Sequence, residues 1–222
     1  PRKLERGCGV ATFMSLKNLI SFGEIAESNP NFIDIDYEPD WKAVFGNTNP
    51  LNLEIGFGVG NFLIEMAIRE PDENFIGMDF YHKGIRKVIT RIDRYQVPNI
   101  RIVYGNAKEK LPVLFNEAEL SQIYINFPDP WPKKRHHKRR LIKPAFVKNL
   151  ATKLKPGGEI HIATDYEPYA IEILEFFEAE LLLTNKSGYR TFLAQKEGIP
   201  QTKYEKKFIN SGEKIFYLEF VK

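Results

Sequence analysis

The stretch Leu51-Asn52-Leu53-Glu54-Ile55-Gly56-Phe57-Gly58-Val59-Gly60 joins a short apolar strand to a tight glycine turn. Residues 61–69 follow with a helical pattern, so together these segments predict a strand–turn–helix unit. The alternation is repeated toward the C-terminus. It predicts further strands at residues 75–79, 100–104, 122–126, 159–164 and 215–221, and further helices at residues 82–95, 143–154 and 167–180. Strands alternating with helices predict an α/β fold with a doubly wound sheet.

Polar residues or glycines follow several of these predicted strands directly. They are Gly56–Gly60, Asp79, Asn106, Asp129 and Asp165. Ligands of open α/β sheets bind outside the carboxyl ends of the strands. The pattern therefore predicts one ligand crevice lined by residues that are far apart in the sequence.

The glycine turn favours a cofactor without phosphate. A dinucleotide-binding turn has the spacing G-x-G-x-x-G, whereas the third glycine here comes one residue earlier. Glu54 precedes the first glycine by two positions, and a carboxylate suits an ammonium group better than a pyrophosphate. With Gly56 and Gly58 allowing close backbone approach, the turn favours S-adenosylmethionine over NAD. The alternative is a plain strand-to-helix turn.

Asp79 and Asn106 extend the predicted cofactor site. Asp79 ends a predicted strand, where its carboxylate can accept hydrogen bonds from two ribose hydroxyls, and Asn106 can bond the edge of an adenine. The alternative for Asp79 is a helix cap. Asp165 also ends a strand, and the N-cap of the following helix is its alternative role.

The stretch from Asn126 to Arg140 reads NFPDPWPKKRHHKRR and combines an acid, three prolines and a basic run. The prolines fix φ and are expected to keep the residues before them extended, which holds Asp129 at the end of a strand. Trp131 can stack on a base or pack beneath the loop. Six of the 32 Lys and Arg residues lie between Lys133 and Arg140, and such a cluster indicates contact with phosphates. A solvated helix start or a localisation signal is the alternative.

The remaining composition limits the class of protein. The 222 residues carry a net charge of only +3 and 43% hydrophobic residues, enough for a full core. Cys8 is the single cysteine, which excludes a disulfide framework and a cysteine-based metal site. No apolar run reaches the ~18 residues of a membrane span, and no secretory signal is visible, so we expect a soluble, cytoplasmic protein.

The chain is expected to have two parts. Residues 1–50 are predicted to be an N-terminal extension that serves as a lid or a packing segment, with a helix at residues 12–27 and an extended segment at residues 32–36. Residues 51–222 are predicted to be the main domain. Within it, the long polar segment 187–212 contains Thr202-Lys203-Tyr204-Glu205, to which the residues alone assign no role.

From residue 51 onward the chain resembles the bacterial tRNA (guanine-N7-)-methyltransferases. The resemblance rests on Glu54–Gly58, on the stretch 126–140, on Ala163-Thr164-Asp165 and on Thr202–Glu205. It implies a class I, S-adenosylmethionine-dependent methyltransferase of Rossmann-like fold, with seven strands of which the last is antiparallel. It also implies that the substrate is a guanosine in the variable loop of tRNA.

The resemblance implies a role for each candidate residue. Those at the cofactor are Glu54, Gly56, Gly58, Asp79, Asn106 and Asp129. Those at the target guanosine are Lys133, Asp165, Thr202, Lys203, Tyr204 and Glu205. Those that contact RNA are Arg135, His136, His137, Lys138, Arg139 and Arg140.

The expected reaction is a single in-line methyl transfer to guanine N7. N7 carries a free lone pair, so the reaction needs no metal and no prior deprotonation, and Asp129 is the predicted catalytic residue because a carboxylate stabilises the cationic product ring. Alternatives are a class I methyltransferase acting on an exocyclic amine of adenine, a non-catalytic RNA-binding partner subunit and a nicotinamide oxidoreductase. The sequence leaves open whether the protein is a monomer or a homodimer.

Overall fold

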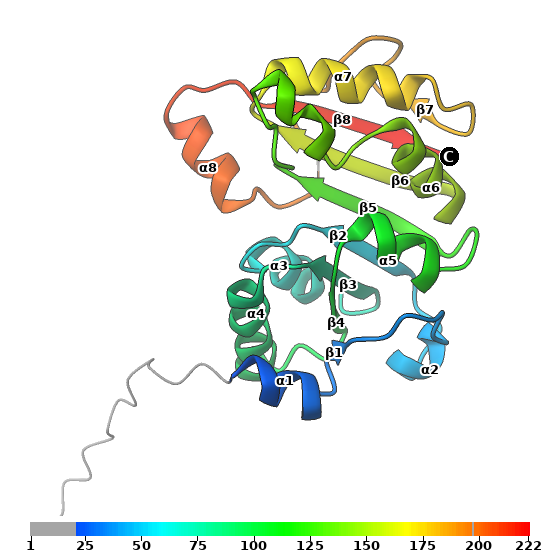
Figure 1. Cartoon of the computed structure of the whole chain (residues 1–222), viewed down its shortest axis with the longest axis vertical. Coiled ribbons are helices and arrows are strands. Elements are labelled where there is room, and N and C mark those ends of the chain that lie inside the picture. The colour runs from blue at the N-terminus through cyan, green and yellow to red at the C-terminus, as the bar shows by residue number, and fades with distance from the viewer. Residues whose placement is uncertain (1–20, 197) are drawn as a thin grey trace, which may run out of the picture.

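A single twisted sheet forms the centre of the computed structural model, which describes residues 21–196 and 198–222 (Figure 1). Its strand order is β1-β4-β3-β2-β5-β6-β8-β7, with β8 antiparallel to its neighbours and the other pairings parallel. The strands are β1 Phe32–Ile33, β2 Leu51–Ile55, β3 Asn74–Asp79, β4 Ile100–Tyr104, β5 Leu120–Asn126, β6 Leu154–Thr164, β7 Thr184–Asn185 and β8 Phe216–Val221.

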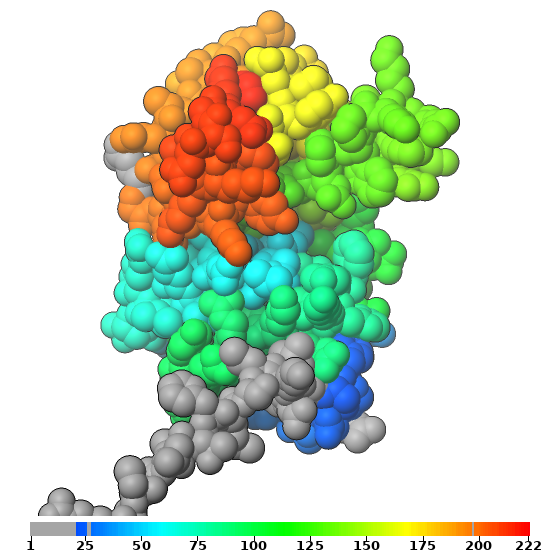
Figure 2. All heavy atoms as spheres, turned by 90° about the vertical axis from the view of Figure 1, so that its left-hand side faces the viewer, coloured from blue at the N-terminus to red at the C-terminus, as the bar shows by residue number. Residues whose placement is uncertain are grey.

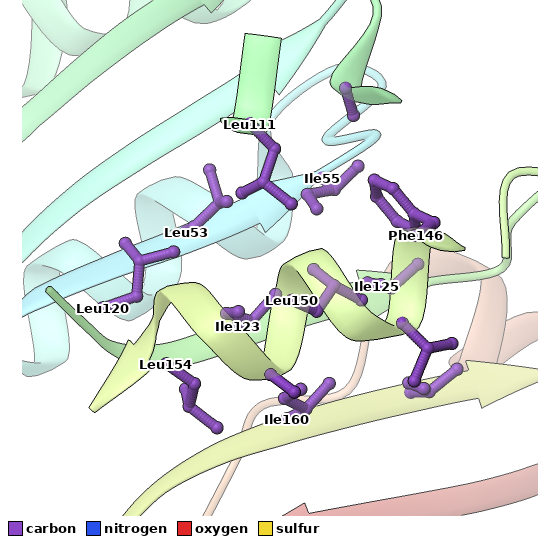
Figure 3. Close-up of a cluster of buried hydrophobic side chains, with 14 of the residues drawn as sticks. Leu53, Ile55, Leu111, Leu120, Ile123, Ile125, Phe146, Leu150, Leu154 and Ile160 are labelled. Atoms are coloured by element: carbon purple, nitrogen blue, oxygen red, sulfur yellow. The ribbon is translucent and has the colours of Figure 1, made fainter. Parts of the chain in front are cut away.

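Helices cover both faces of the sheet. They are α1 Phe22–Ser28, α2 Trp41–Phe45, α3 Asn61–Arg69, α4 His82–Tyr95, α5 Ala107–Leu114, α6 Pro144–Lys153, α7 Glu167–Glu178 and α8 Lys203–Asn210, with a 3₁₀ helix η1 at Lys134–Arg139. One apolar cluster joins α5, α6 and α7 to one face, and a second joins α1, α3 and α4 to the other. Figure 3 shows the first cluster, where Phe146 and Leu150 of α6 pack on Ile123 and Ile125 of β5.

The strand order reverses between β2 and β5, which lie side by side although β3 and β4 separate them in sequence. At such a switch point the connections leave on opposite faces of the sheet, and a crevice opens at the carboxyl ends of the two strands. Here the glycine turn follows β2, and the proline loop follows β5. The fold therefore brings the two informative stretches of the sequence together.

The predicted α/β class, the parallel strands and the antiparallel β8 are confirmed. The sheet has one strand more than the seven expected, because Phe32 and Ile33 of the N-terminal extension pair with β4. Strand β6 begins at Leu154 rather than at residue 159, since Leu154 pairs with Leu120 across a register shift. Helices α2, α5 and α8 were not predicted. Of the predicted helix at residues 12–27, the part up to residue 20 lies outside the described residues. Cys8 also lies outside them.

The described part of the N-terminal extension packs on the domain edge. Trp41 is buried, stacks on Phe115 with ring centroids 5.5 Å apart, and donates from its indole N–H to the Leu114 carbonyl oxygen at 2.9 Å. Lys110 of α5 donates to Asp36 Oδ1 at 2.8 Å. Residues 32–45 thereby cover apolar surface beside α5. Within the part of the chain that the structure describes, no helix has the length and apolar character required to cross a membrane.

Candidate functional site

The glycine turn after β2 is held in place by Asp79. Gly56 and Gly58 have φ of +78° and +60°, a conformation that glycine adopts without steric cost. The Gly58 N–H donates to Asp79 Oδ2 at 2.8 Å, and the Tyr81 N–H donates to Oδ1 at 3.0 Å. Burial raises the pKa of Asp79. Helix α4 also lies close, because a Cβ on Gly84 would meet the Gly58 carbonyl oxygen at 1.9 Å.

Glu54 is a buried acid at the start of this turn, with 3% of its surface exposed. Its Oε1 accepts a hydrogen bond from Asn126 Nδ2 at 3.5 Å, whereas its Oε2 has no partner among the described residues. Burial raises the pKa of Glu54 to about 8, although Asn126 and the charge of Lys196 act in the opposite direction. A buried carboxylate oxygen without a partner is costly, and it is suited to a cationic ligand.

Lys196 connects the crevice to α8, and the sequence did not reveal this residue. Its ammonium donates to Asn126 Oδ1 at 3.1 Å and to Glu205 Oε2 at 3.2 Å. Burial lowers the pKa of Lys196, and the charge of Glu205 opposes that change. No local pattern could identify Lys196, because it is 70 residues away from Asn126.

Thr202 and Glu205, both predicted to bind the target guanosine, form a capping box at the start of α8. The Glu205 N–H donates to Thr202 Oγ1 at 3.1 Å, and the Thr202 N–H donates to Glu205 Oε2 at 2.7 Å. Both side chains are buried, Glu205 completely. Lys203 and Tyr204 are exposed. Lys203 and Tyr204 are therefore free to contact a substrate, whereas Thr202 and Glu205 stabilise the start of the helix that carries them.

The proline loop departs from its predicted backbone conformation. Phe127 and Trp131 both precede a proline, yet their φ values are +52° and +42°, so they are not extended. Left-handed conformations of bulky residues are strained and persist where the surroundings hold them. The Phe127 N–H donates to the Ala163 carbonyl oxygen at 2.8 Å, and its ring lies 6.0 Å from that of Tyr204. Trp131 packs against Arg139, whose guanidinium carbon is 4.8 Å from the ring centroid.

Asp129, Lys133 and Asp165 are exposed near the carboxyl ends of β5 and β6. The negative charge of Asp129 is close enough to contribute to the raised pKa of Asp79. Tyr166, not Asp165, occupies the N-cap position of α7, so the alternative role of Asp165 as a cap does not apply. Asn106 does cap α5, accepting from the Lys108 N–H at 3.1 Å, and it stays exposed.

The basic run divides into exposed cations and one buried arginine. Arg135, Lys138 and Arg139 on η1 are exposed, and His136 and His137 are half-buried. Arg140 was predicted to contact RNA, and the structure corrects this prediction because only 1% of its surface is exposed. It forms an ion pair with Glu172 and donates from Nε to the Pro130 carbonyl oxygen at 2.8 Å. Arg140 therefore anchors the proline loop to α7.

Replacing Arg140 with methionine is expected to destabilise the fold by about 3 kcal/mol, because breaking a buried ion pair leaves its partners unsatisfied. The free energy of unfolding in urea measures the loss. Arg139→Met is the matched control, since the exposed Arg139 should lose at most a few tenths of a kcal/mol, about the size of a surface effect. Equal stability of the two variants would contradict the anchoring role.

A second charged cluster lies on β6 and β8, away from the glycine turn. His161 Nδ1 is 2.6 Å from Glu219 Oε1, and Glu159 supplies a further carboxylate within 4.8 Å. These three side chains could hold a metal ion. However, Lys186 Nζ lies 2.8 Å from Glu159 and 3.1 Å from Glu219. The ammonium of Lys186 thus already pairs with both carboxylates and offsets one of their two negative charges.

This cluster predicts a loss of stability in acid. The close contact with His161 is the main cause that lowers the pKa of Glu219, to about 2 from 4.5. The ionised form is therefore favoured in the folded state, so its contribution is complete above pH 4.5 and is lost as the pH falls toward 2. Melting temperatures measured across this range should be higher for the native protein than for Glu219→Gln, and the two curves should converge in acid. Parallel curves would contradict the assignment.

The strand order, the antiparallel β8 and an acid two positions before the glycine turn define a class I methyltransferase fold. The structure is similar to the 16S rRNA methyltransferase KamB, with a TM-score of 0.58 at 14% identity, covering 83% of this chain and 94% of that one. It is also similar to the aminoglycoside resistance methyltransferase NpmB1, with a TM-score of 0.55 at 16% identity, covering 82% and 91%. At these identities the likeness supports the fold alone.

Sequence comparisons give the family. The family model described as "Putative methyltransferase" matches residues 48–218. The chain is 38% identical over 204 residues to the tRNA (guanine-N(7)-)-methyltransferase of Geobacter metallireducens, covering 88% of this chain and 94% of that protein. It is 40% identical over 190 residues to the enzyme of the same name from Bordetella pertussis, covering 84% and 74%. The chain belongs to the bacterial tRNA (guanine-N(7)-)-methyltransferase family, as its motifs predicted.

Proposed function

We propose that this protein transfers a methyl group from S-adenosylmethionine to N7 of a guanosine in tRNA, and that the target lies in the variable loop. Family membership supports the reaction. The structural observation that carries the proposal is the buried Glu54 carboxylate, whose Oε2 has no partner within residues 21–196 and 198–222 and lies beside the glycine turn at the switch point of the sheet.

The chemistry of the crevice fits S-adenosylmethionine. Glu54 would hold the ammonium of its methionine part, because a buried cation and a buried carboxylate stabilise each other. Asp79 would hold the ribose hydroxyls and Asn106 the adenine edge. When bound, S-adenosylmethionine supplies an electrophilic methyl group on a sulfonium. A nicotinamide cofactor fits less well, since its pyrophosphate would face the Glu54 carboxylate.

Positioning supplies most of the catalysis. N7 attacks with its own lone pair, so no residue has to remove a proton from it, and holding the guanine in line is the main requirement. Asp129 stabilises the positive charge that develops on the guanine ring. Lys133, Asp165 and the exposed Lys203 and Tyr204 hold the target nucleoside. No metal takes part in this reaction.

The exposed cations of η1 bind the RNA backbone. Arg135, Lys138 and Arg139 project from a short helix that begins directly after the proline loop. Contacts from such cations to phosphates fix the register of an RNA on its enzyme. N7 lies in the deep, narrow groove of an RNA helix, which side chains reach poorly, so the target guanosine has to be exposed or extruded. All of these candidate residues lie within residues 51–222, which we assign as the catalytic domain.

One incubation tests the proposal. Unmodified tRNA and S-adenosylmethionine carrying a labelled methyl group are mixed with the protein in the presence of a metal chelator, and the methylated base is then mapped. Label at N7 of a variable-loop guanosine is the expected result. Label on an adenine amine would overturn the reaction, and absence of label together with absence of cofactor binding would indicate a non-catalytic RNA-binding protein.

A further inference from the structure

Helices α3, α4 and α8 border an open hollow of about 540 Å³. Its lining includes four cations, namely Arg69, Arg91, Lys203 and Lys206. In Figure 2, α8 (orange) lies against the cyan segment that contains α3. This α3–α8 hollow is separate from the exposed cations of η1, which belong to the light green lobe on another side of α8.

Little negative charge opposes these cations. The hollow contains one acid, Glu65, whose carboxylate is already paired with Arg69 at 2.7 Å. Lys203 and Lys206 are exposed, and neither forms an ion pair with a described residue. The one acid of α8, Glu205, is buried and turned inward to Lys196. The surface is therefore complementary to a polyanion.

The hollow also offers apolar contact beside its cations. Ile68 and Tyr95 line it, and 57% and 51% of their surfaces are exposed. An acidic peptide would use the charges alone. A nucleotide uses both features, because its base stacks on an aromatic ring while its phosphate binds a cation.

The hollow is also tied to the crevice. Arg91 Nη1 donates to the Val59 carbonyl oxygen at 3.0 Å and to Asn61 Oδ1 at 2.6 Å, so it holds the end of the glycine turn. Lys203, at the first position of α8, lies next to Tyr204, which we propose contacts the target nucleoside. A strand that leaves the crevice over α8 would pass directly into the hollow.

We propose that the α3–α8 hollow is a second binding surface for the tRNA backbone. The bound tRNA would contact the cations of η1 first, then cross the crevice, and then contact the hollow. The proposal rests on the proposed function, because it takes tRNA as the substrate. The two cationic surfaces would hold the RNA on different sides of the target guanosine, which positions that base between them.

Charge reversal of Arg69 and Lys206 tests the proposal. Neither residue is placed at the cofactor or at the target nucleoside. The double variant Arg69→Glu/Lys206→Glu should bind tRNA about 10-fold more weakly, and the slope of log Kd against log salt should fall by about 1.5, since each lost phosphate contact removes roughly 0.7–0.9. Its affinity for S-adenosylmethionine should be unchanged. The matched control Lys42→Glu/Lys148→Glu reverses two exposed lysines on α2 and α6, away from the crevice.

Binding is measured by fluorescence anisotropy of labelled tRNA over a series of KCl concentrations. A loss in the first variant and not in the control supports the surface. Equal losses in both variants would overturn it, since they would reflect net charge alone. An unchanged tRNA affinity in the first variant would overturn it as well. The loss of the ion pair between Arg69 and Glu65 in that variant would not alter this conclusion. The native protein is assayed in parallel for N7 methylation, so a failure of the proposed function is seen separately.

Discussion

The variant Asp129→Ala is expected to lose about 100- to 1000-fold in kcat while it keeps its fold. Removing one preorganised electrostatic contact to a developing charge typically has an effect of this size. Asp129 is exposed and makes no hydrogen bond or ion pair with another described residue, so little stability depends on it. Single-turnover methylation of tRNA with saturating cofactor measures the chemical step.

Two companion variants sharpen the test. Asp72→Ala removes another exposed acid from a site remote from the loop, and it should keep full activity. Asp129→Asn distinguishes charge from hydrogen bonding. If the carboxylate acts by its charge, asparagine is as poor as alanine, whereas partial activity of Asp129→Asn indicates a hydrogen bond to the guanine edge. Full activity of Asp129→Ala would remove Asp129 from the mechanism.

The sheet could be predicted because its strands carry their own signal. Apolar runs bounded by turns identify buried parallel strands, and β2, β3 and β5 lie within two residues of their expected limits. Since parallel strands end at one edge, the polar residues after them were predicted to meet, and the structure brings Gly58 and Asp79 into contact. The short strand β1 was expected only as an extended segment, because two residues carry too little pattern to predict their pairing.

The start of helix α8 is marked in the sequence by a capping-box pattern, but those residues were assigned to substrate binding instead. Thr202 followed three residues later by Glu205 is the pattern of a capping box. The resemblance assigned all of Thr202–Glu205 to the substrate, although the structure uses the first and last of them to start a helix. Helix α5 was missed for the opposite reason, because Pro112 interrupts its pattern.

Arg140 and Lys196 could not have been assigned from the sequence. Arg140 looks like the other five cations of its run, and only its packing under the proline loop against Glu172 separates it from them. Lys196 lies in a polar segment without periodicity, yet its position between Asn126 and Glu205 closes the polar network of the crevice. Both roles depend on contacts between residues far apart in the chain, which no local pattern records.

Glu54→Gln is expected to weaken S-adenosylmethionine binding by about 100-fold or more, because truncating one partner of a buried charge pair costs roughly 2–5 kcal/mol. Glutamine has nearly the shape of glutamate, so the packing is preserved and the charge alone is removed. Isothermal titration calorimetry measures the affinity. Glu65→Gln is the matched control, because it removes a partly exposed acid of α3 and should leave the affinity intact. A substitution at Asn52 would not serve as a control, since Asn52 is itself buried.

The same substitution should have the opposite effect on the cofactor-free protein. Burial raises the pKa of Glu54 to about 8 from 4.5, so the folded state keeps a proton that the unfolded state loses, and stability falls as the pH rises between these values. Glutamine stays neutral, so Glu54→Gln should melt at a higher temperature than the native protein at about pH 9 and at a similar temperature at about pH 5. Cofactor binding to the native protein near neutral pH should release protons, detected as a dependence of the binding enthalpy on the buffer, and the variant should lack this release. A variant less stable at high pH would show that groups of the protein already stabilise the Glu54 anion, which would leave no uncompensated carboxylate for the cofactor to neutralise.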